Sequence, residues 1–461
     1  MDAKVPFAIL LIFTVLGSAL AVISPPPVSA QVGCDTPITT STTLTFNVGP
    51  CSGNGLVIGA NGITLNCAKR MINGTGTGIG VNITGHTGVT VENCLVSGFT
   101  TGIYLFSSSG DTLTKNTANA DGFGFRLIKS SSSTLSKNKA NNNHLDGFSL
   151  ETSSNKNKLT GNSATSDIYA FSLSSSSSNT LSSNTANSNG YGIYLTNSSS
   201  NSLSSNTANS NGDFGIYLTS SSNGNTLSKN TASSNHLTGF SLGSSNGNKL
   251  TGNTAKSNLN SGFAISSSIT NPLTLNTANG NKYYGFNIAG SSSNTLSKNT
   301  ANSNVYGFYL SSSPGNTLSK NTANKNGYYG FGIGSSSSNT LSGNTANTNV
   351  VYGFLFWSFS ESTVTGNNAN SNVYGFYLST ATGNTLSKNT ANKNSFYGFG
   401  LGSSSGNTLT GDTAKSNKQY GYSDDSMGIG TGGTENTYSS DVSSGNGLGG
   451  SSPAGLGAPQ H

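Results

Sequence analysis

The chain has 461 residues and a formal net charge of +6, but only 8% of its residues are charged. Hydrophobic residues account for 32%, and 60 residues are glycine. Arg70 and Arg126 are its only arginines, so we do not expect it to bind nucleic acid, whose phosphates are held by clustered basic side chains.

Residues 1–30 have the pattern of a secretory signal peptide. Lys4 precedes an apolar run from Val5 to Ile23, and a small-residue cleavage site follows at 28–30. The run is long for a signal peptide, so an uncleaved membrane anchor is the alternative, and this segment is the only membrane contact that we expect. The predicted location is secreted or cell-surface, with a periplasmic-type space as the alternative.

All four cysteines lie in the first hundred residues, in or just after a predicted N-terminal cap at residues 31–80. In an exported chain, such cysteines are expected to form disulfides. Cys67 and Cys94 each follow an asparagine at the end of a short alternating strand, so stacked strands would place their Cα atoms about 5 Å apart. We therefore predict the pair Cys67–Cys94, which leaves Cys34 to pair with Cys51.

A unit of 22 to 24 residues recurs without interruption from Leu113 to Leu409. Within it apolar and polar residues alternate, which indicates short strands, and Asn, Gly and Ser supply the turns. Parallel strands need crossover connections, and these are almost always right-handed. We predict an all-β fold, a right-handed parallel β-helix of about sixteen rungs. The repeats are placed at residues 81–423, and residues 424–461 are expected to be a C-terminal cap and a flexible Gly/Ser-rich tail.

Regular columns of residues are expected to fill the interior of this solenoid. The column of Phe376 and the column of Leu378, two residues later, carry nearly all the large apolar side chains. Asparagines three residues after each Leu anchor, such as Asn116, are expected to form a hydrogen-bonded ladder at a corner. Strict alternation from Phe376 points Tyr374 inward, so the tyrosines before the glycine are expected to be buried or half-buried.

The repeated unit N-T-L-S-x-N-x-A-x-x-N-x-x-G-[FI]-x-L-x-x-S resembles the parallel β-helix repeats of the NosD-like and pectate-lyase-like superfamily. The resemblance spans roughly residues 60 to 423. It implies the fold but leaves the function open, because the superfamily holds polysaccharide lyases, hydrolases, epimerases, surface adhesins and NosD-like periplasmic proteins linked to copper.

Catalytic and metal-binding residues are not evident in the pattern. Glycoside hydrolysis needs two nearby carboxylates, and in the repeats the acids best placed to approach one another are Asp121, Asp146 and Asp167 on successive rungs. A copper site needs clustered His, Met or Cys, and these residues are widely separated. We therefore predict no catalytic residue, no metal ligand and no cofactor, and enzymatic activity is left open but not favoured.

Outward-facing positions offer a more promising surface. Between the Phe and Leu columns several residues are tyrosine: Tyr104, Tyr194, Tyr217, Tyr309 and Tyr377. Exposed rings along a rod can stack on sugars or on another rod. A second outward column contains the lysines Lys115, Lys137, Lys229, Lys298, Lys320 and Lys388. These lysines would keep the sheet soluble or hold acidic polysaccharide weakly.

The leading hypothesis is an exported, non-catalytic β-helix rod that acts in cell-surface or extracellular adhesion, matrix or glycan contact. Its expected partners are polysaccharides or other cell-surface molecules. Two alternatives remain. One is a carbohydrate-active enzyme of the polysaccharide lyase or hydrolase type, and the other is a NosD-like periplasmic accessory protein for copper-enzyme maturation.

Overall fold

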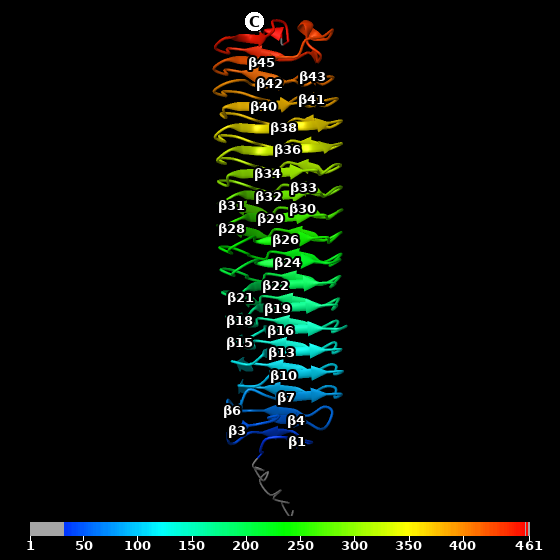
Figure 1. Cartoon of the computed structure of the whole chain (residues 1–461), viewed down its shortest axis with the longest axis vertical. Coiled ribbons are helices and arrows are strands. Elements are labelled where there is room, and N and C mark those ends of the chain that lie inside the picture. Colours follow the sequence, from blue (N-terminus) through cyan, green and yellow to red (C-terminus); the bar gives the residue numbers. More distant parts are fainter. Residues whose placement is uncertain (1–31, 457, 460–461) are drawn as a thin grey trace, which may run out of the picture. The chain divides into compact units, whose positions relative to one another are not determined.

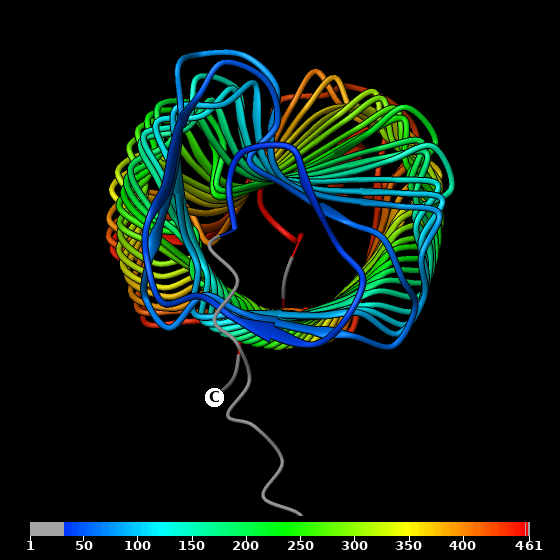
Figure 2. The same ribbon diagram turned by 90° about the horizontal axis from the view of Figure 1, so that it is seen from below.

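The computed structural model describes residues 32–456, 458 and 459. The predicted signal peptide lies outside these residues. The described chain winds into a right-handed parallel β-helix of about 17 turns, close to the predicted number. Its strands stack along one axis (Figure 1), and the view along that axis shows the walls of the coil (Figure 2). Three stacks of parallel strands form these walls, and we call them sheets A, B and C.

Sheet A is the most regular wall and contains 19 strands. Its strands are β1 (Thr36–Ile38), β4 (Leu56–Ile58), β7 (Ile79–Thr84), β10 (Thr101–Phe106), β13 (Phe123–Ile128), β16 (Asp146–Glu151), β19 (Tyr169–Ser174), β22 (Tyr191–Thr196), β24 (Ile216–Thr219), β26 (Phe240–Gly243), β29 (Ser261–Ser266), β32 (Tyr284–Ala289), β34 (Tyr306–Ser311), β36 (Tyr329–Ser337), β38 (Tyr352–Ser360), β40 (Tyr374–Ser379), β42 (Phe399–Gly402), β45 (Tyr420–Asp424) and β48 (Gly449–Ser452).

Sheet B carries the Leu anchors at the centres of short strands. These are β2 (Thr42–Thr43), β5 (Thr64–Asn66), β8 (Thr90–Glu92), β11 (Thr112–Thr114), β14 (Thr134–Ser136), β17 (Lys158–Thr160), β20 (Thr180–Ser182), β23 (Ser202–Ser204), β25 (Thr226–Ser228), β27 (Lys249–Thr251), β30 (Pro272–Thr274), β33 (Thr295–Ser297), β35 (Thr317–Ser319), β37 (Thr340–Ser342), β39 (Thr363–Thr365), β41 (Thr385–Ser387), β43 (Thr408–Thr410) and β46 (Thr437–Ser439).

Sheet C carries the alanine column and is partly reduced to single bridges, such as that between Thr300 and Thr322. Its strands are β3 (Val48–Cys51), β6 (Met71–Gly74), β9 (Leu95–Ser97), β12 (Thr117–Asn119), β15 (Lys139–Asn141), β18 (Ser163–Thr165), β21 (Thr185–Ala186), β28 (Thr254–Lys256), β31 (Thr277–Asn279), β44 (Thr413–Lys415), β47 (Val442–Ser444) and β49 (Ala458–Pro459). A short 3-10 helix, η1 (Thr431–Gly433), lies near the C-terminal end.

The interior consists of the columns that the repeat predicts. Phe308 pairs with Phe331 and Leu310 with Ile333 in the register of β34 and β36, and all four side chains are buried. The phenyl rings of Phe308 and Phe331 are parallel, with centroids 4.7 Å apart. Because each turn repeats the same residues one strand spacing further on, aromatic and aliphatic stacks run along the interior of the solenoid.

The predicted asparagine ladder lines a corner of the coil. The backbone N–H and side-chain amide of Asn321 both donate to Oδ1 of Asn344, at 2.9 Å and 3.0 Å. The same side-chain amide also donates to the backbone oxygen of Leu296 in the preceding turn, at 2.9 Å. Each asparagine thus pairs buried backbone groups at a turn, where an unpaired group would cost about 1–3 kcal/mol.

Both predicted disulfide pairs are present. Cys34 is bonded to Cys51, and Cys67 is bonded to Cys94 with Cα atoms 4.7 Å apart. Strands β1 and β4 pair in parallel with each other and β4 pairs with β7, so stacked strands also run through the residues predicted as the N-terminal cap.

Parallel strand pairing also continues in the segment after residue 423. Strand β46 pairs with β43, β47 with β44, and β48 with β45, all in parallel. The Gly/Ser-rich segment therefore adds a further turn to all three sheets. Its weaker repeat pattern concealed this turn from sequence analysis.

Candidate functional site

The outer surface of sheet A is the most distinctive part of the molecule. A full repeat directs three side chains outward there: the residue before the glycine, the residue between the Phe and Leu columns, and the residue after the Leu. In β34 these are Tyr306, Tyr309 and Ser311, which are half-buried, whereas the three residues between and beside them are buried. The outer surface therefore presents three parallel columns of side chains.

Gly307 explains why strict alternation fails before the Phe column. A Cβ atom on Gly307 would lie 2.9 Å from Cβ of Ala323 and 2.9 Å from the amide nitrogen of Asn326, so this position faces the interior at the corner between sheets C and A. Gly307 and Phe308 therefore both point inward, which leaves Tyr306 outside. The same corner turns Tyr374 outward, so its expected half-burial is correct but its expected inward direction is wrong.

A first aromatic cluster lies on β19 to β24. The rings of Tyr169 and Tyr191 have centroids 4.8 Å apart, and Tyr194 lies 5.1 Å from Tyr169. Tyr217 stacks on Phe214 at 4.6 Å and lies 5.6 Å from Tyr194. These five residues form one connected set of rings along three turns.

A second and longer aromatic cluster covers β32 to β45. The ring centroids of Tyr306 and Tyr329 are 4.6 Å apart, and those of Tyr352 and Tyr374 are 5.1 Å apart. The members are Tyr283, Tyr284, Tyr306, Tyr309, Tyr328, Tyr329, Tyr352, Trp357, Tyr374, Tyr377, Phe396, Tyr397 and Tyr420. We call the two clusters together the aromatic face.

Some of these rings pack directly against the backbone of glycines at outward positions. The indole of Trp357 occupies the space that a Cβ atom on Gly334 would fill. The hydroxyl of Tyr377 would lie 2.7 Å from a Cβ atom on Gly402. These rings are therefore held against the backbone of neighbouring strands, which restricts their rotamers before any ligand binds.

Two phenol groups of the face have raised pKa values. Burial, together with the nearby Asp213, raises the pKa of Tyr191 to about 12. Burial and the neighbouring tyrosines also raise the pKa of Tyr329. These two phenols are therefore uncharged hydrogen-bond donors and acceptors at neutral pH, each beside an apolar ring.

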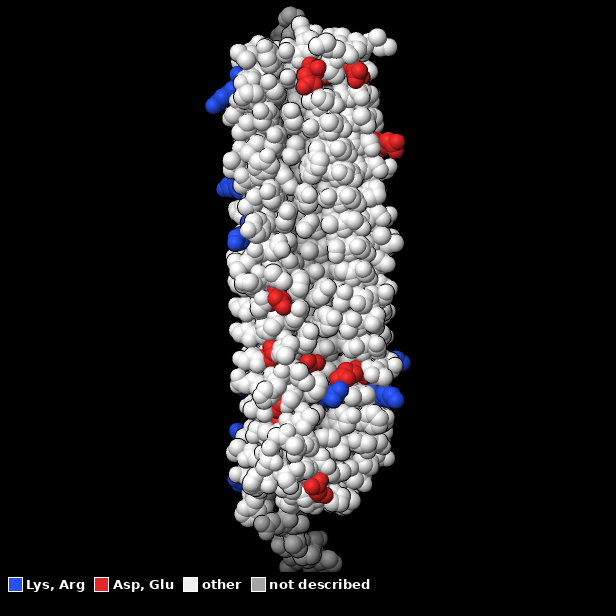
Figure 3. Space-filling view, viewed as in Figure 1, with Lys and Arg blue, Asp and Glu red and all other residues white. Residues whose placement is uncertain are grey.

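Small side chains separate the two clusters. On β26 and β29 the outward positions include Ser241, Gly243, Ala264 and Ser266. Figure 3, viewed as in Figure 1, shows few charged side chains over the central part of this face and carboxylates near its C-terminal end. The second aromatic cluster lies along this sparsely charged surface, and Lys282 lies 5.3 Å from the ring centroid of Tyr283 at its first turn.

The N-terminal end of the same surface is charged. Arg126 donates to both carboxylate oxygens of Glu151, at 2.8 Å from Nε and 3.0 Å from Nη2, and its guanidinium lies 4.2 Å from the ring centroid of Phe123. Asp146 begins the strand that contains Glu151, and its side chain is only 8% exposed. Burial raises the pKa of Asp146 to about 6, and hydrogen bonds from Ser149 and Ser172 offset part of that rise.

Four of the five predicted outward tyrosines belong to the aromatic face. Tyr194 and Tyr217 belong to the first cluster, and Tyr309 and Tyr377 belong to the second. Tyr104 lies apart from both, beside Phe106, with ring centroids 6.1 Å apart. Sequence reasoning missed Trp357, although it is the chain's only tryptophan and follows the buried column on an outward position.

The other two acids of the predicted carboxylate group have a structural role. The backbone N–H of Phe99 donates to Asp121 and that of Asn143 donates to Asp167, in a ladder where asparagine is the usual residue. Their second carboxylate oxygens have no hydrogen-bond partner within the described residues. Asp121 and Asp167 therefore belong to the interior, and only Asp146 reaches the outer surface.

Comparison with known proteins places this fold in a family. The family model described as "Periplasmic copper-binding protein (NosD)" matches residues 38–231 and 207–324, which together cover more than half of the chain. The chain belongs to the NosD family. A model described as "Right handed beta helix region" matches residues 290–441 of this NosD-family protein. No curated protein matches it.

Several solved structures are similar to this NosD-family protein in fold. A double mutant of the periplasmic alginate epimerase AlgG is 12% identical, covers 83% of this chain and 86% of its own, and gives a TM-score of 0.41. DFA-IIIase from Arthrobacter chlorophenolicus A6 is 12% identical, with coverages of 50% and 70% and a TM-score of 0.38. The A-module of the Azotobacter vinelandii mannuronan C-5 epimerase AlgE6 is 12% identical, with coverages of 76% and 88% and a TM-score of 0.30.

The family description names copper, but the described residues do not fit a copper site. No group of three or more His, Cys, Asp or Glu side chains converges within residues 32–456. All four cysteines are in disulfides, and Nδ1 of His86 and of His144 already contacts an oxygen of Asn61 and of Asp121. We therefore assign no role in this NosD-family protein to bound copper.

Two observations indicate that this NosD-family protein is exported. The family is described as periplasmic, and two disulfides are typical of an oxidising compartment. Among the described residues, no helix has the length and apolar character that a membrane span requires.

Proposed function

We propose that this protein contacts polysaccharide outside the cytoplasm, with the glycan lying along the aromatic face of sheet A. The observation that carries the proposal is the second aromatic cluster, which continues without a gap across seven turns of sheet A from Tyr284 to Tyr420. No catalytic step is needed for this function.

The chemistry of the face suits sugar rings. Pyranose rings combine apolar C–H faces with hydroxyl groups, and tyrosine combines an aromatic ring with a hydroxyl donor and acceptor. The aromatic residues recur once per strand spacing of about 4.8 Å, so a linear glycan meets an equivalent group at each turn. Once one sugar is bound, its neighbours are held close to the next turns, so many weak contacts together give a higher overall affinity.

A protein partner is the main competing ligand for an aromatic surface. Most rings of the second cluster are half-buried by one another, and only Tyr283 and Tyr328 are clearly exposed, at 43% and 40%. The surface therefore exposes only part of each ring, together with polar groups, and is not a continuous apolar patch. This favours a polar ligand with small apolar faces over the apolar core of a protein interface.

Affinity electrophoresis in gels that contain neutral or acidic polysaccharides tests the proposal. We expect the wild-type chain to be retarded by at least one polysaccharide, and the triple substitution Tyr306→Ala, Tyr309→Ala, Trp357→Ala to lose at least tenfold in affinity. The matched control replaces outward residues of sheet B at the same level, Thr295→Ala, Ser297→Ala and Thr317→Ala. Equal loss in both variants, or no retardation of the wild type, would contradict the proposal.

The charged end of the face supports a second candidate function, a carbohydrate-active enzyme. Burial raises the pKa of Asp146, which lies near the Arg126–Glu151 ion pair, and a protonatable acid close to a second carboxyl group is the combination that acid–base catalysis on glycans uses. The test is product release from polysaccharides that the wild type binds. Activity that is lost in Asp146→Asn but kept in Asp213→Asn would establish the enzyme; binding without any product would exclude it for those glycans.

A further inference from the structure

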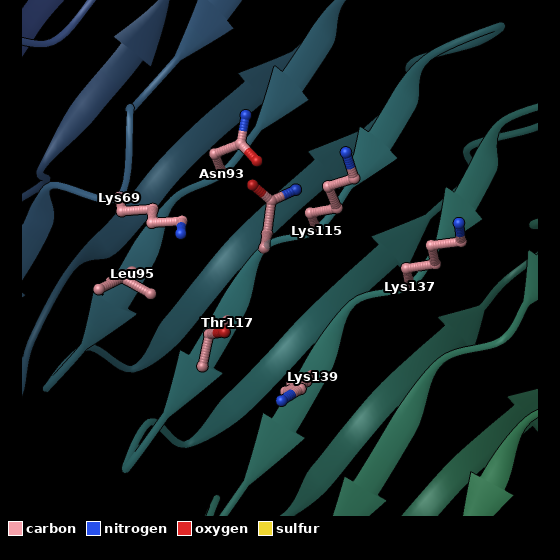
Figure 4. Close-up of a pocket in the computed structure, with 8 residues that line it drawn as sticks. Lys69, Asn93, Leu95, Lys115, Thr117, Lys137 and Lys139 are labelled. Carbon is pink, nitrogen blue, oxygen red and sulfur yellow. The ribbon is translucent and has the colours of Figure 1, made fainter.

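A pocket of about 320 Å³ lies at the corner between sheets B and C, near the N-terminal end of the coil. It is lined by Lys69, Asn93, Leu95, Lys115, Asn116, Thr117, Lys137 and Lys139. Three of the lysines occupy corners between strands, and Lys139 begins β15 (Figure 4). We call this feature the lysine pocket.

The lysine pocket concentrates positive charge without a counter-charge. No Asp or Glu lines it, and none of its four lysines forms an ion pair or a cation–π contact within the described residues. Lys115 and Lys137 sit at equivalent corners of adjacent turns, and Figure 4 shows their side chains extending in the same direction. The two corners are one strand spacing apart, about 4.8 Å, so two like charges stand on neighbouring turns.

The corners themselves do not require lysine. Lys69, Lys115 and Lys137 have φ angles of 63°, 57° and 55°, in the left-handed region that favours glycine and asparagine. Asn93 and Gly161 occupy the same column with similar angles. The corner geometry therefore does not call for lysine, and what sets this pocket apart is that Lys115 and Lys137 on adjacent turns are joined by Lys69 and Lys139 around one hollow.

The pocket is held in a fixed shape. The disulfide Cys67–Cys94 ties together the two corners that carry Lys69 and Asn93. The N–H of Lys69 donates to the oxygen of Asn93 at 2.8 Å, and the N–H of Lys115 donates to the oxygen of Ser136 at 3.0 Å. A pre-organised wall of this kind lowers the entropy lost on binding.

We propose that the lysine pocket is a binding site for an anionic saccharide, one that carries carboxylate, sulfate or phosphate groups. The volume is in the range of pockets for organic ligands and exceeds that needed for a single inorganic anion. Leu95, at 36% exposed, adds an apolar surface for the C–H face of a sugar ring, and Asn93 and Thr117 add hydrogen-bonding groups. The site is on another wall of the coil from the aromatic face, so the inference does not depend on the proposed function.

Isothermal titration with a short oligogalacturonate tests this site, with its methyl ester as the uncharged control. We expect the acid form to bind the wild type at low salt, the methyl ester to bind at least tenfold more weakly, and the acid form to weaken as salt is raised. The substitutions Lys115→Gln and Lys137→Gln together should reduce binding of the acid form at least tenfold, whereas Lys115→Arg and Lys137→Arg should retain most of it.

A matched control is available further along the same column. Lys298 and Lys320 also occupy corners of adjacent turns, where the residues two positions later are Thr300 and Thr322 instead of Thr117 and Lys139. Lys298→Gln with Lys320→Gln should leave binding within twofold of the wild type. An equal loss from both double substitutions would show diffuse charge attraction and overturn the proposal. So would equal affinity for the methyl ester, or affinity for polyphosphate as high as for the oligogalacturonate.

Discussion

Trp357 covers Gly334, the residue directly paired with it in the preceding strand of sheet A. The centroid of the indole also lies 5.9 Å from the ring centroid of Tyr309, two turns away. Because Gly334 on the turn between them has no side chain, the indole can reach across that turn toward Tyr309. This arrangement shows how the aromatic face is built. Small residues on one turn make room for large rings from the next.

We predict that Gly334→Ala displaces the indole, because a methyl group at this position would overlap it. The chain has a single tryptophan, so its fluorescence reports on this site alone. The emission should shift to longer wavelength and iodide quenching should increase, with a stability loss of about 1 kcal/mol. The control is Gly243→Ala on β26, where the nearest atoms lie 3.7 Å from the added methyl group. An unchanged spectrum in Gly334→Ala would contradict the packing described here.

We predict that Asp412→Asn stabilises the protein at neutral pH. Asp412 occupies the asparagine ladder, where the backbone and side chain of Asn389 donate to its Oδ1 and its Oδ2 has no partner among the described residues. Burial raises the pKa of Asp412 to about 8, and the nearby Asp441 contributes to that rise. An asparagine would present an amide that could donate to the oxygen of Leu386, as Asn389 donates to Val364.

The pH dependence follows from that shift. The unfolded carboxyl loses its proton near pH 4 and the folded one near pH 8, so the folded state binds more protons between these values. The stability contributed by this group therefore falls as pH rises from about 4 to 8. The free energy of unfolding of Asp412→Asn, measured by chemical denaturation, should exceed that of the wild type by about 2 kcal/mol at pH 8. The two values should become equal near pH 4. Glu361→Gln, at an exposed position, should show no such divergence. A constant difference at all pH values would refute this explanation.

We predict that removing one disulfide destabilises only the N-terminal turns. The loop closed by Cys67–Cys94 spans 27 residues, and its loss should cost about 3 kcal/mol locally. Each turn contacts chiefly its neighbours, so hydrogen exchange in Cys67→Ser, Cys94→Ser should increase in β5 and β8 and stay unchanged in β36 and β38. Uniform loss of protection along the whole coil would show that the solenoid unfolds as a single unit.

Much of the fold could be predicted because the repeat aligns chemically equivalent residues. The Phe308 and Leu310 columns recur in register, and only stacked strands bury both columns at once. The position of Cys67 and Cys94 after equivalent strands was likewise enough to predict their bond. The turns at both ends were harder to recognise in the sequence. Residues before 81 and after 423 keep the strand pairing, but their sequence no longer follows the repeated motif.

The aromatic face could be predicted only in part. Alternation correctly placed Tyr309 and Tyr377 outside, but it takes no account of the corner at Gly307, where two successive residues face the interior. The signal was available, since a glycine precedes the Phe column in turn after turn beside a column of alanines. The lysine pocket could not be predicted from the sequence. Lys69 and Lys137 line the same pocket because of the corner geometry, which the repeat pattern does not reveal.

The central claim is that ligand binding is spread along the aromatic face and not confined to one pocket. The most direct test compares, on one polysaccharide that the wild type binds, the variant Tyr309→Ala with a variant that lacks residues 305–372. This deletion removes three whole turns and joins Asn304 to Val373, which begins the same Val-Tyr-Gly-Phe-Tyr-Leu motif as the deleted Val305. Circular dichroism should show that both variants keep the β-fold.

We predict that Tyr309→Ala weakens binding by about threefold or less, because rings on adjacent turns remain. The deletion should weaken binding much more, because it removes Trp357 and most of the central rings of the second cluster. If Tyr309→Ala alone abolishes binding in a folded protein, or if the deletion leaves binding unchanged, the ligand does not lie along this face and the account is wrong.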